Sequence, residues 1–365
     1  KKNYRNKMKA LILVGGFGTR LRPLTFTCPK PIVPFANKPM IMHQIEALVN
    51  VGVTEVVLAI GYEPEKMKED LSKAVAKSGL KVTITYSHET EPMGTAGPLA
   101  LASDILTTDN EDNMFFVLNS DVSCTYPLAD LVTFHKNHGK EGTIMVTPVD
   151  DPSKYGVVKH NDVGLIDAFI EKPKVYVGSN INAGIYIFNT SILKRIPNQP
   201  TSIEREIFPK MAADQQLYAM ELKGFWMDVG QPHDYLTGMC LYLDANRSTT
   251  PEIKDDTIEI IQPVLIDASA KIGAHSKIGP NVVIGPNVVV GENCRLSRTT
   301  IMEGSKISDS SFVHSSIVGW NSRLGRWSHL TNETVLGEDV TVKEGVILNG
   351  VKVCLHKGVS SDILE

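Results

Sequence analysis

The chain has 365 residues, a formal net charge of −4 at pH 7, 42% hydrophobic and 21% charged residues. This length suits two domains, and the composition is that of an ordinary globular protein. Acidic and basic residues are spread over both halves, so neither nucleic acid nor an anionic membrane is expected as a partner. No apolar run approaches the roughly 20 residues that cross a bilayer.

Five scattered cysteines without CxxC spacing predict neither a zinc site nor a disulfide framework. A reducing, cytoplasmic location fits this pattern best. Residues 1–7 are basic but lead into no apolar segment of a signal peptide, and Met8 resembles a natural start.

The first sign of chemistry is a short apolar run, 10–14, that predicts a buried strand and ends at Gly15 and Gly16. Because glycine has no Cβ, such a turn exposes backbone N–H groups that can bind phosphate oxygens. Arg20 and Lys30, the latter between two prolines, add positive charge. The spacing fits neither the Walker A motif nor the dinucleotide fingerprint. We predict a polyphosphate-binding loop of another kind.

Strands and helices alternate over the next hundred residues, which predicts a mostly parallel sheet with helices on both faces. The expected strands are 55–60, 82–86 and 113–118, and the expected helices are 39–51, 64–76 and 95–106. Loops that bind phosphate lie at the carboxyl ends of such strands. The glycine turn and Asp121 are therefore expected along one edge of the sheet.

Strands dominate the following segment, which we interpret as a substrate-side lobe of the same domain. They are expected at 143–147, 156–159, 166–170 and 184–188, with helices at 203–211 and 234–246. The stretch 248–262 is the predicted linker, because 248–256 is polar and contains a proline. The catalytic domain is accordingly 8–247 and the C-terminal domain 263–365.

Aliphatic residues recur every six positions in the C-terminal domain, with one residue dropped before Ile301 and another before Val318. This period predicts a left-handed parallel β-helix, whose triangular coils point one aliphatic side chain inward on each side. The expected inward residues are Ile266, Ile272, Ile278, Ile284, Val290, Leu296, Ile301, Ile307, Val313, Val318, Leu324, Leu330, Leu336, Val342, Leu348 and Cys354.

The stretch 15–25, together with the Pro-Lys-Pro at 29–31, resembles the signature of the sugar-1-phosphate nucleotidylyltransferases. The similarity runs from about Met8 to near the C-terminus and is to the members that make GDP-mannose. It implies a Rossmann-like nucleotidyltransferase domain and Mg²⁺-dependent transfer of GMP from GTP to α-D-mannose 1-phosphate. Because the faces and ends of a β-helix offer flat surfaces and unpaired strand edges, we expect a homo-oligomer formed through the β-helix, with a related regulatory subunit as a further partner.

The resemblance assigns the metal ion to Asp121 and Asp228, although a single Asp after a strand is more often a turn or cap residue. It makes Arg20 the residue that neutralises the departing pyrophosphate, and Lys30 would hold the triphosphate. These four are the expected catalytic residues. The expected nucleotide-binding residues are Leu13, Gly15, Gly16, Gly18, Thr19, Arg20, Lys30, Glu89, Gly94, Thr95, Asn119 and Asp121.

For the sugar phosphate, a Glu-Lys-Pro element at 171–173 resembles the one in the family. Lys172 would bind the phosphate as a point charge, and Glu171 would accept hydrogen bonds from sugar hydroxyls. The expected sugar-phosphate residues are Asn119, Gly156, Glu171, Lys172, Asn182 and Asp228.

The loop expected to recognise the base of the nucleotide contains Glu89, which stands about five residues before Gly94. Relatives that use UTP or dTTP tend to carry Gln there. A carboxylate can accept hydrogen bonds from N1–H and N2–H of guanine but has no donor for uracil. Our hypothesis is that Glu89 contributes guanine preference; a solvated loop glutamate is the alternative.

Two other functions remain open. The first is a uridylyltransferase acting on N-acetylglucosamine 1-phosphate with acetyltransferase activity in the β-helix, where histidines stand at 275, 314, 329 and 356. The repeat contains no long insertion that could bind acyl-CoA, and none of these histidines is singled out by its surroundings in the sequence. Both observations count against this function. The second is a regulatory homologue that only binds, which predicts losses among the four catalytic residues; all four are present.

Overall fold

The computed structural model describes residues 8–16, 18–61, 64–247 and 256–364. The chain divides into two compact units. Unit 1 comprises the chain up to Gly16 and Ile41–Trp226, and unit 2 comprises Phe17–Met40 and Met227–Glu365. Within the described ranges, no helix is both long enough and apolar enough to cross a membrane.

Unit 1 is built on a nine-stranded sheet with the order β10-β9-β11-β6-β1-β4-β5, in which β8 pairs with β11 and β12. Strands β5, β4, β1 and β6 run parallel, and β11 is antiparallel to β6. The strands are β1 (Met8–Leu13), β4 (Val53–Ile60), β5 (Thr83–His88), β6 (Met114–Asn119), β8 (Gly142–Pro148), β9 (Gly156–His160), β10 (Ile166–Glu171), β11 (Asn180–Asn189) and β12 (Leu217–Glu221). The mixed, mostly parallel sheet is confirmed, as is the strand-rich segment after residue 142.

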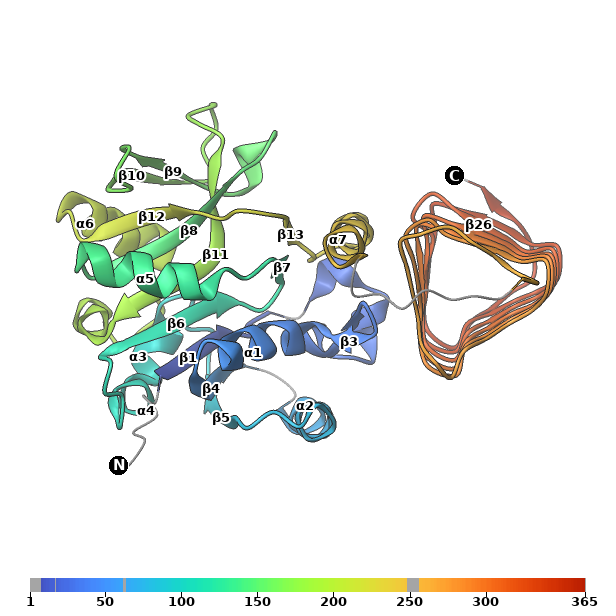
Figure 1. Cartoon of the computed structure of the whole chain (residues 1–365), viewed down its shortest axis with the longest axis horizontal. Coiled ribbons are helices and arrows are strands. Elements are labelled where there is room, and N and C mark those ends of the chain that lie inside the picture. The colour runs from blue at the N-terminus through green and yellow to red at the C-terminus, as the bar shows by residue number, and fades with distance from the viewer. Residues whose placement is uncertain (1–7, 17, 62–63, 248–255, 365) are drawn as a thin grey trace. The chain divides into compact units, whose positions relative to one another are not determined.

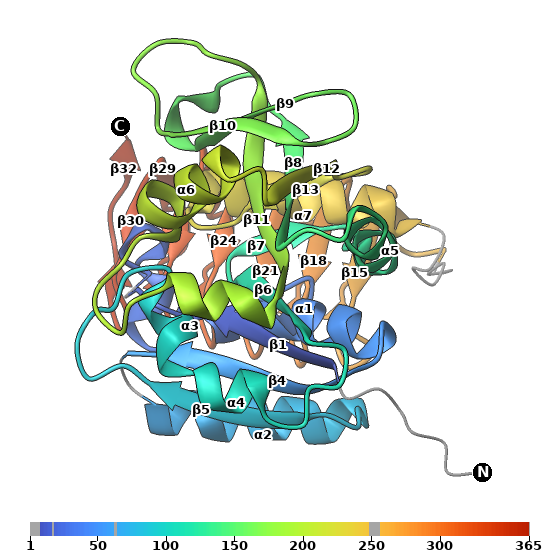
Figure 2. The ribbon, with the colours of Figure 1, turned by 90° about the vertical axis from the view of Figure 1, so that its left-hand side faces the viewer.

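Helices cover both faces of this sheet. Helices α3, α4 and α6 pack in one apolar cluster with alternate sheet residues such as Leu11 and Val117 (Figure 2). Ala10 and Ile12 point to the opposite face and are also fully buried, and α1 and α5 lie on that side (Figure 1). The helices are α1 (Met40–Asn50), α2 (Pro64–Ser78), α3 (Gly97–Leu101), α4 (Ser103–Thr107), α5 (Leu128–His138) and α6 (Phe208–Ala213).

Two expected helices are wrong in detail. The helix expected at 95–106 begins only at Gly97 and is interrupted at Ala102, whose φ of −88° and ψ of 8° leave the helical region. The helix expected at 203–211 is a π-helical turn, Ile203–Ile207, followed by α6. Such turns often occur at functional sites.

The C-terminal part of unit 2 is a parallel β-helix, seen along its coils in Figure 1 as a triangle. Its three parallel sheets have the orders β14-β17-β20-β23-β26-β29-β32, β15-β18-β21-β24-β27-β30 and β16-β19-β22-β25-β28-β31. Asparagines at corners such as Asn281, Asn287 and Asn293 adopt positive φ, which this residue tolerates well. The arrangement is consistent with the expected left-handed form.

The strands of the β-helix are short. They are β14 (Glu259–Ile260), β15 (Val264–Ile266), β16 (Lys271–Ile272), β17 (Lys277–Ile278), β18 (Val282–Ile284), β19 (Val289–Val290), β20 (Arg295–Ser297), β21 (Thr299–Ile301), β22 (Lys306–Ile307), β23 (Phe312–His314), β24 (Ile317–Val318), β25 (Arg323–Leu324), β26 (His329–Thr331), β27 (Val335–Leu336), β28 (Thr341–Val342), β29 (Ile347–Asn349), β30 (Lys352–Val353), β31 (Gly358–Val359) and β32 (Ile363–Leu364).

The inward residues expected from the six-residue period are confirmed from Ile278 to Leu348, all of them in the core of the coils. Cys354 is wrong: it is exposed, and the inward residue is Val353, which pairs with Leu336. One more residue is dropped here than the period predicts. Strand β14 pairs with β17, and residues 248–255 of the expected linker lie outside the described ranges; the domain boundaries stay a prediction.

The N-terminal segment of unit 2 is anchored on helix α7 (Pro232–Ala245) and on one sheet of the β-helix. The ring of Phe35 meets Tyr235 edge-on at 5.4 Å between centroids. Tyr235 Oη donates a hydrogen bond to the carbonyl of Pro34, and Asn37 Nδ2 donates to the carbonyl of Ile284 at 2.8 Å. The segment also contains the short pair β2 (Pro34–Phe35) and β3 (Lys38–Pro39). The β-helix therefore supports the segment that carries Arg20 and Lys30.

Candidate active site

The glycine turn lies at the carboxyl end of β1 in unit 1. Leu13, the last residue of β1, pairs with Ala59 on one side and Asn119 on the other. Gly16 has a φ of 102°, a conformation that favours glycine. Among the described residues, a Cβ on Gly15 or Gly16 would meet no atom within 4 Å. The backbone here faces open space, as a phosphate-binding turn requires.

Asp121 is half-buried in the turn between β6 and β7 (Val122–Cys124). The backbone N–H of Ser120 donates to the carbonyl of Leu13 at 3.2 Å, which ties this turn to the end of β1. The structure thus brings Asn119 and Asp121 to the edge of the sheet where β1 ends, as the sequence predicts.

The expected base-reading loop is held by its own glutamate. Glu89 Oε2 accepts a hydrogen bond from the backbone N–H of Met93 at 3.0 Å. Gly94 has a φ of 73°, and a Cβ there would lie 2.5 Å from the carbonyl oxygen of Thr201. Only glycine fits this close approach. Glu89 therefore shapes the loop in addition to any contact with a base.

The same loop is fastened to the π-helical turn. Thr95 Oγ1 donates to Glu204 Oε2 at 2.6 Å and accepts from the backbone N–H of Ile203 at 2.9 Å. Ser202 Oγ also donates to Glu204 Oε2, at 2.9 Å. Thr95 is thus a structural link between the expected nucleotide loop and an acidic side chain on the turn.

The sugar-phosphate residues Gly156 and Glu171 are paired across β9 and β10. A Cβ on Gly156 would lie 2.5 Å from Phe169 Cζ and 2.8 Å from Glu171 Oε2, so a larger residue would displace both. Lys172 has its side chain 59% exposed, and its Nζ lies 3.6 Å from Glu171 Oε1. The lysine is available to an incoming anion, and the glutamate is enclosed.

Burial raises the pKa of Glu171, the negative charge of Glu204 raises it further, and the positive charge of Lys172 opposes both. Burial likewise raises the pKa of Tyr186, whose hydroxyl accepts a hydrogen bond from Asn182 Nδ2 at 2.9 Å. Asn182 Oδ1 in turn accepts from the backbone N–H of Gly184 at 3.0 Å. Hydrogen bonds at both Nδ2 and Oδ1 therefore fix the orientation of the Asn182 amide.

In unit 2, Gly18 begins the loop that carries the expected catalytic cations. It has a φ of 59°, and its carbonyl accepts a hydrogen bond from Thr25 Oγ1 at 2.8 Å. A Cβ on Gly18 would lie 3.0 Å from Lys30 Cβ. Thr19 and Arg20 follow in a short 3₁₀ helix, Thr19–Leu21, and both are exposed.

Three of the four expected catalytic residues come together in unit 2 around Gly230. A Cβ on Gly230 would lie 2.7 Å from Asp228 Oδ1, 3.0 Å from Arg20 Nη2 and 3.2 Å from Lys30 Nζ. Arg20 and Lys30 are far from Asp228 in the sequence, so this meeting is a product of the fold. One carboxylate and two cations gathered around one glycine are groups suited to binding polyphosphate and a metal ion.

Among the described residues, no group of three or more His, Cys, Asp or Glu side chains could hold a metal ion. A Mg²⁺ ion in nucleotide enzymes is bound by one or two carboxylates, with phosphate oxygens and water completing its shell. Asp121 in unit 1 and Asp228 in unit 2 each carry a carboxylate of the kind that such an ion requires.

Sequence reasoning did not single out three residues that bind expected site residues in their own unit: Gln44, Glu204 and Gly230. Gly230 stands two residues after Asp228, and its place near two cations depends on long-range folding. Gln44 is a fully buried amide on the apolar side of α1. A polar residue on the apolar face of a predicted helix was the feature of the sequence that could have pointed to Gln44.

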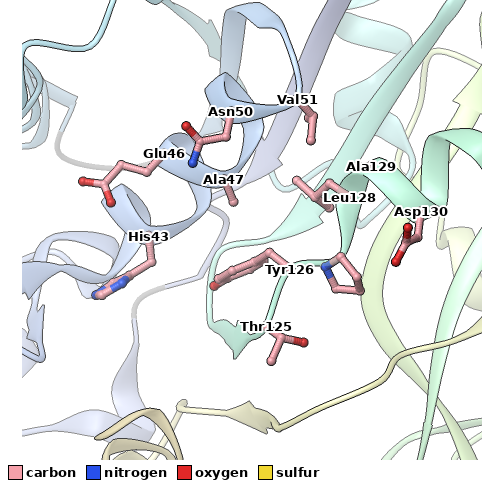
Figure 3. Close-up of a pocket in the computed structure, with 11 residues that line it drawn as sticks. His43, Glu46, Ala47, Asn50, Val51, Thr125, Tyr126, Leu128, Ala129 and Asp130 are labelled. Carbon is pink, nitrogen blue, oxygen red and sulfur yellow. The ribbon is translucent and has the colours of Figure 1, made fainter. Parts of the chain in front are cut away.

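A separate cavity of about 330 Å³ lies between α1 and the loop from β7 to α5 (Figure 3). His43, Glu46, Tyr126 and Asp130 line it, with none of the expected site residues. Tyr126 Oη donates to the carbonyl of Val122 at 2.6 Å, so one wall of the cavity touches the turn that carries Asp121.

Comparison with known proteins places the chain among nucleotide-transferring enzymes. Residues 9–245 match the nucleotidyl transferase family, and residues 260–365 match the GMPPB C-terminal domain. Over 359 residues the chain is 59% identical to mannose-1-phosphate guanylyltransferase catalytic subunit beta of Dictyostelium discoideum, covering 98% of this chain and 99% of that one. It is 60% identical to mannose-1-phosphate guanyltransferase of Schizosaccharomyces pombe, covering 98% of each.

Solved structures with a similar fold cover about two thirds of the chain. HddC from Yersinia pseudotuberculosis is 27% identical, with a TM-score of 0.53, over 63% of this chain and 97% of that chain. A putative glucose-1-phosphate thymidylyltransferase from Bacillus anthracis, 24% identical, has a TM-score of 0.57 over 68% of this chain and 98% of its own, a likeness of fold alone. The chain belongs to the nucleotidyl transferase family and, within it, to the mannose-1-phosphate guanylyltransferases.

Proposed function

We propose that this enzyme transfers GMP from GTP to α-D-mannose 1-phosphate and releases GDP-mannose and pyrophosphate. The names of its relatives support this reaction, with identities of 55–60% over 98% of the chain. The observation that carries the proposal in the structure is the meeting of Arg20, Lys30 and Asp228 around Gly230.

The chemical problem is to bring two polyanions together. An oxygen of the sugar phosphate attacks the α-phosphorus of GTP, and the bond to the leaving pyrophosphate breaks, so charge neutralisation and alignment do most of the work. Arg20 and Lys30 provide two positive charges for the triphosphate, and Arg20 stabilises the negative charge that develops on pyrophosphate. The open backbone at Gly15 and Gly16 leaves room for phosphate oxygens.

Asp121 and Asp228 would hold a divalent ion. The nucleotidyl transferase family works with such ions, and we propose Mg²⁺ because hard carboxylate and phosphate oxygens suit it. When bound, it neutralises phosphate charge. Asp228 has its Oδ1 fixed by the backbone N–H of Gly230 at 2.9 Å, which orients the carboxylate before any ligand arrives.

On the sugar side, Lys172 supplies an exposed ammonium for the phosphate, and the enclosed Glu171 accepts hydrogen bonds from hydroxyl groups. Asn182, oriented by Gly184 and Tyr186, and Asn119 complete the proposed pocket. Glu89 would read guanine with the carboxylate oxygen that does not bind Met93. HddC, with 26% identity in a second crystal structure, has been crystallised with GMP-PN.

We also propose that the chain assembles through its β-helix, with itself and with a related regulatory subunit. Support comes from the stacked coils, whose ends leave unpaired strand edges. A cytoplasmic location is supported by the five free cysteines.

The test is a pyrophosphate-release assay over a grid of four nucleoside triphosphates and several hexose 1-phosphates. GTP with mannose 1-phosphate should give the highest kcat/KM. A best pair of UTP with N-acetylglucosamine 1-phosphate would contradict the proposal and favour the uridylyltransferase alternative.

A further inference from the structure

Gln44 lies on α1 and is fully buried. Its Nε2 donates two hydrogen bonds, to the carbonyl oxygen of Asn119 at 2.8 Å and to that of Val122 at 3.1 Å. These two carbonyls stand immediately before and after the Ser120–Asp121 turn. One side-chain amide therefore spans the turn that presents Asp121.

The chemistry of this contact favours an amide. Two carbonyl oxygens need a donor with two hydrogens, and the NH₂ of an amide supplies both without burying a charge. With the amide reversed, Oε1 would face two acceptors. A glutamate in its place would put a carboxylate against the same two oxygens, which repels them.

The contact has a cost elsewhere in the same side chain. Among the residues that the structure describes, Gln44 Oε1 has no hydrogen-bond partner although it is buried. An unsatisfied buried acceptor destabilises a fold, so the two hydrogen bonds of Nε2 are offset in part by the desolvated Oε1 of the same side chain.

The turn is also held from its other side. Val122, whose carbonyl binds Gln44, accepts a second hydrogen bond from Tyr126 Oη at 2.6 Å. Both lone pairs of this carbonyl are thereby engaged. The carbonyl of Val122, the residue that follows Asp121, is held by two donors, one on α1 and one in the loop before α5.

We propose that Gln44 is a positioning residue that sets the direction of the Asp121 carboxylate for metal binding. The proposal rests on the proposed function, because it takes Asp121 as a metal ligand. Residues behind metal ligands commonly matter in this way, and losing one typically lowers metal affinity by about 10- to 100-fold.

The chain offers a matched control at the opposite end of the same strand. Asn110 is also a buried amide, and its Nδ2 donates to the carbonyls of Leu106 at 2.9 Å and Met114 at 3.0 Å. Its Oδ1 is likewise buried without a hydrogen-bond partner among the described residues. Asn110 thus has the same chemistry as Gln44, but at the end of β6 away from Asp121.

The experiment compares Gln44→Met with Asn110→Leu in the full-length chain. Mn²⁺ binding is followed by the EPR signal of the free ion, in the presence of a non-hydrolysable GTP analogue. Gln44→Met should raise the Kd for Mn²⁺ by about 10-fold or more. Asn110→Leu should leave that Kd within about twofold of the unmodified protein's value. The two variants should lower Tm by similar amounts, because each removes two buried hydrogen bonds.

Equal shifts in the two variants, or none in Gln44→Met, would overturn the inference. If Gln44→Met does not fold, Gln44→Asn replaces it: the amide is kept but is one methylene too short to reach both carbonyls, so the Kd must still rise. Asp121→Asn separates the two proposals. If Asp121→Asn leaves the Mn²⁺ affinity unchanged, Asp121 is not a metal ligand, whatever the result for Gln44→Met. If Asp121→Asn weakens Mn²⁺ binding and Gln44→Met does not, only the inference about Gln44 is wrong.

Discussion

The backbone N–H of Gly230 donates a hydrogen bond to Oδ1 of Asp228, with nitrogen and oxygen 2.9 Å apart. The same glycine leaves no room for a side chain, because a Cβ would come within 3.2 Å of Asp228, Arg20 and Lys30. Gly230 therefore allows one carboxylate and two cations to come together because it has no side chain. A substitution of this glycine can disturb the cluster without removing any of its charges.

The first prediction is that Gly230→Ala keeps the fold and loses activity. The atoms that an added Cβ would meet are the ends of flexible side chains, which can move at little cost. Their displacement should lower kcat/KM by roughly 10²-fold, the effect typical of a misplacement of about 1 Å. Steady-state kinetics and thermal unfolding together provide the test, and an enzyme with full activity would show that this cluster is not catalytic.

The second prediction concerns Gly15, which faces open space and has no positive φ. Gly15→Ala should leave Tm unchanged but raise KM for GTP about tenfold, or ~1.4 kcal/mol, because the methyl group would occupy the space of phosphate oxygens. Gly358→Ala is the matched control, since a Cβ on that glycine of the β-helix would also meet no atom of the described residues within 4 Å. Equal KM values in both variants would argue against a phosphate site at this turn.

The third prediction tests base choice through Glu89→Gln. The amide oxygen of glutamine can still accept the hydrogen bond from Met93, so the loop should stay in place. Hydrogen bonds to a charged group contribute about 1.5–3 kcal/mol, so the preference for GTP over UTP should fall by roughly 10- to 100-fold. The measurement is the ratio of kcat/KM for the two nucleotides; an unchanged ratio refutes the role of Glu89 in guanine recognition.

The fourth prediction follows from the raised pKa of Glu171, which burial and the charge of Glu204 both favour. A raised pKa means that Glu171 takes up a proton at a higher pH than an ordinary glutamate. As pH falls, kcat/KM for mannose 1-phosphate should therefore decline early. Glu204→Gln removes the negative neighbour, lowers the pKa of Glu171, and should move this decline to lower pH.

The control for this experiment is Glu206→Gln. Glu206 lies on the same π-helical turn and accepts a hydrogen bond from the backbone N–H of Ser202, but it does not contribute to the pKa of Glu171. The phosphate of the substrate titrates equally in all variants, so only differences between profiles count. Coincident profiles for Glu204→Gln and Glu206→Gln would exclude the coupling.

The sequence predicted the β-helix well because each coil repeats one local rule, an aliphatic residue on each side. The same regularity explains the error at Cys354, since a single dropped residue moves the inward position to Val353. The interruption at Ala102 has no comparable signal. Alanine is a strong helix former, so its presence at this position predicts a continuous helix and not a break.

Site residues were predictable where a local motif carries them. The glycine turn and Asp121 follow apolar strands, and parallel strands end at a common edge. The contacts of Gln44 and Glu204 join segments about 75 and 109 residues apart, so no local pattern reports them. Glu89 has a second partner, Met93, that the reasoning about guanine did not foresee.

The fifth prediction concerns the metal. Asp121→Asn and Asp228→Asn should each lower kcat by more than the roughly 10²–10³-fold seen for one lost oxyanion donor, because the bound ion is lost as well. Both variants keep the size and shape of the side chain. Each should also abolish saturable Mn²⁺ binding in the presence of a GTP analogue. If a variant still binds Mn²⁺, the aspartate that it replaces is not a metal ligand.

The central claim is that two aspartates distant in the sequence share one divalent ion. It is tested most directly by a crystal structure with Mn²⁺, a non-hydrolysable GTP analogue and mannose 1-phosphate, in which anomalous scattering locates the ion. The account predicts one ion with a carboxylate oxygen of Asp121 and one of Asp228 both in its coordination shell. An ion bound by only one of them, with the other too far away to coordinate, would contradict it.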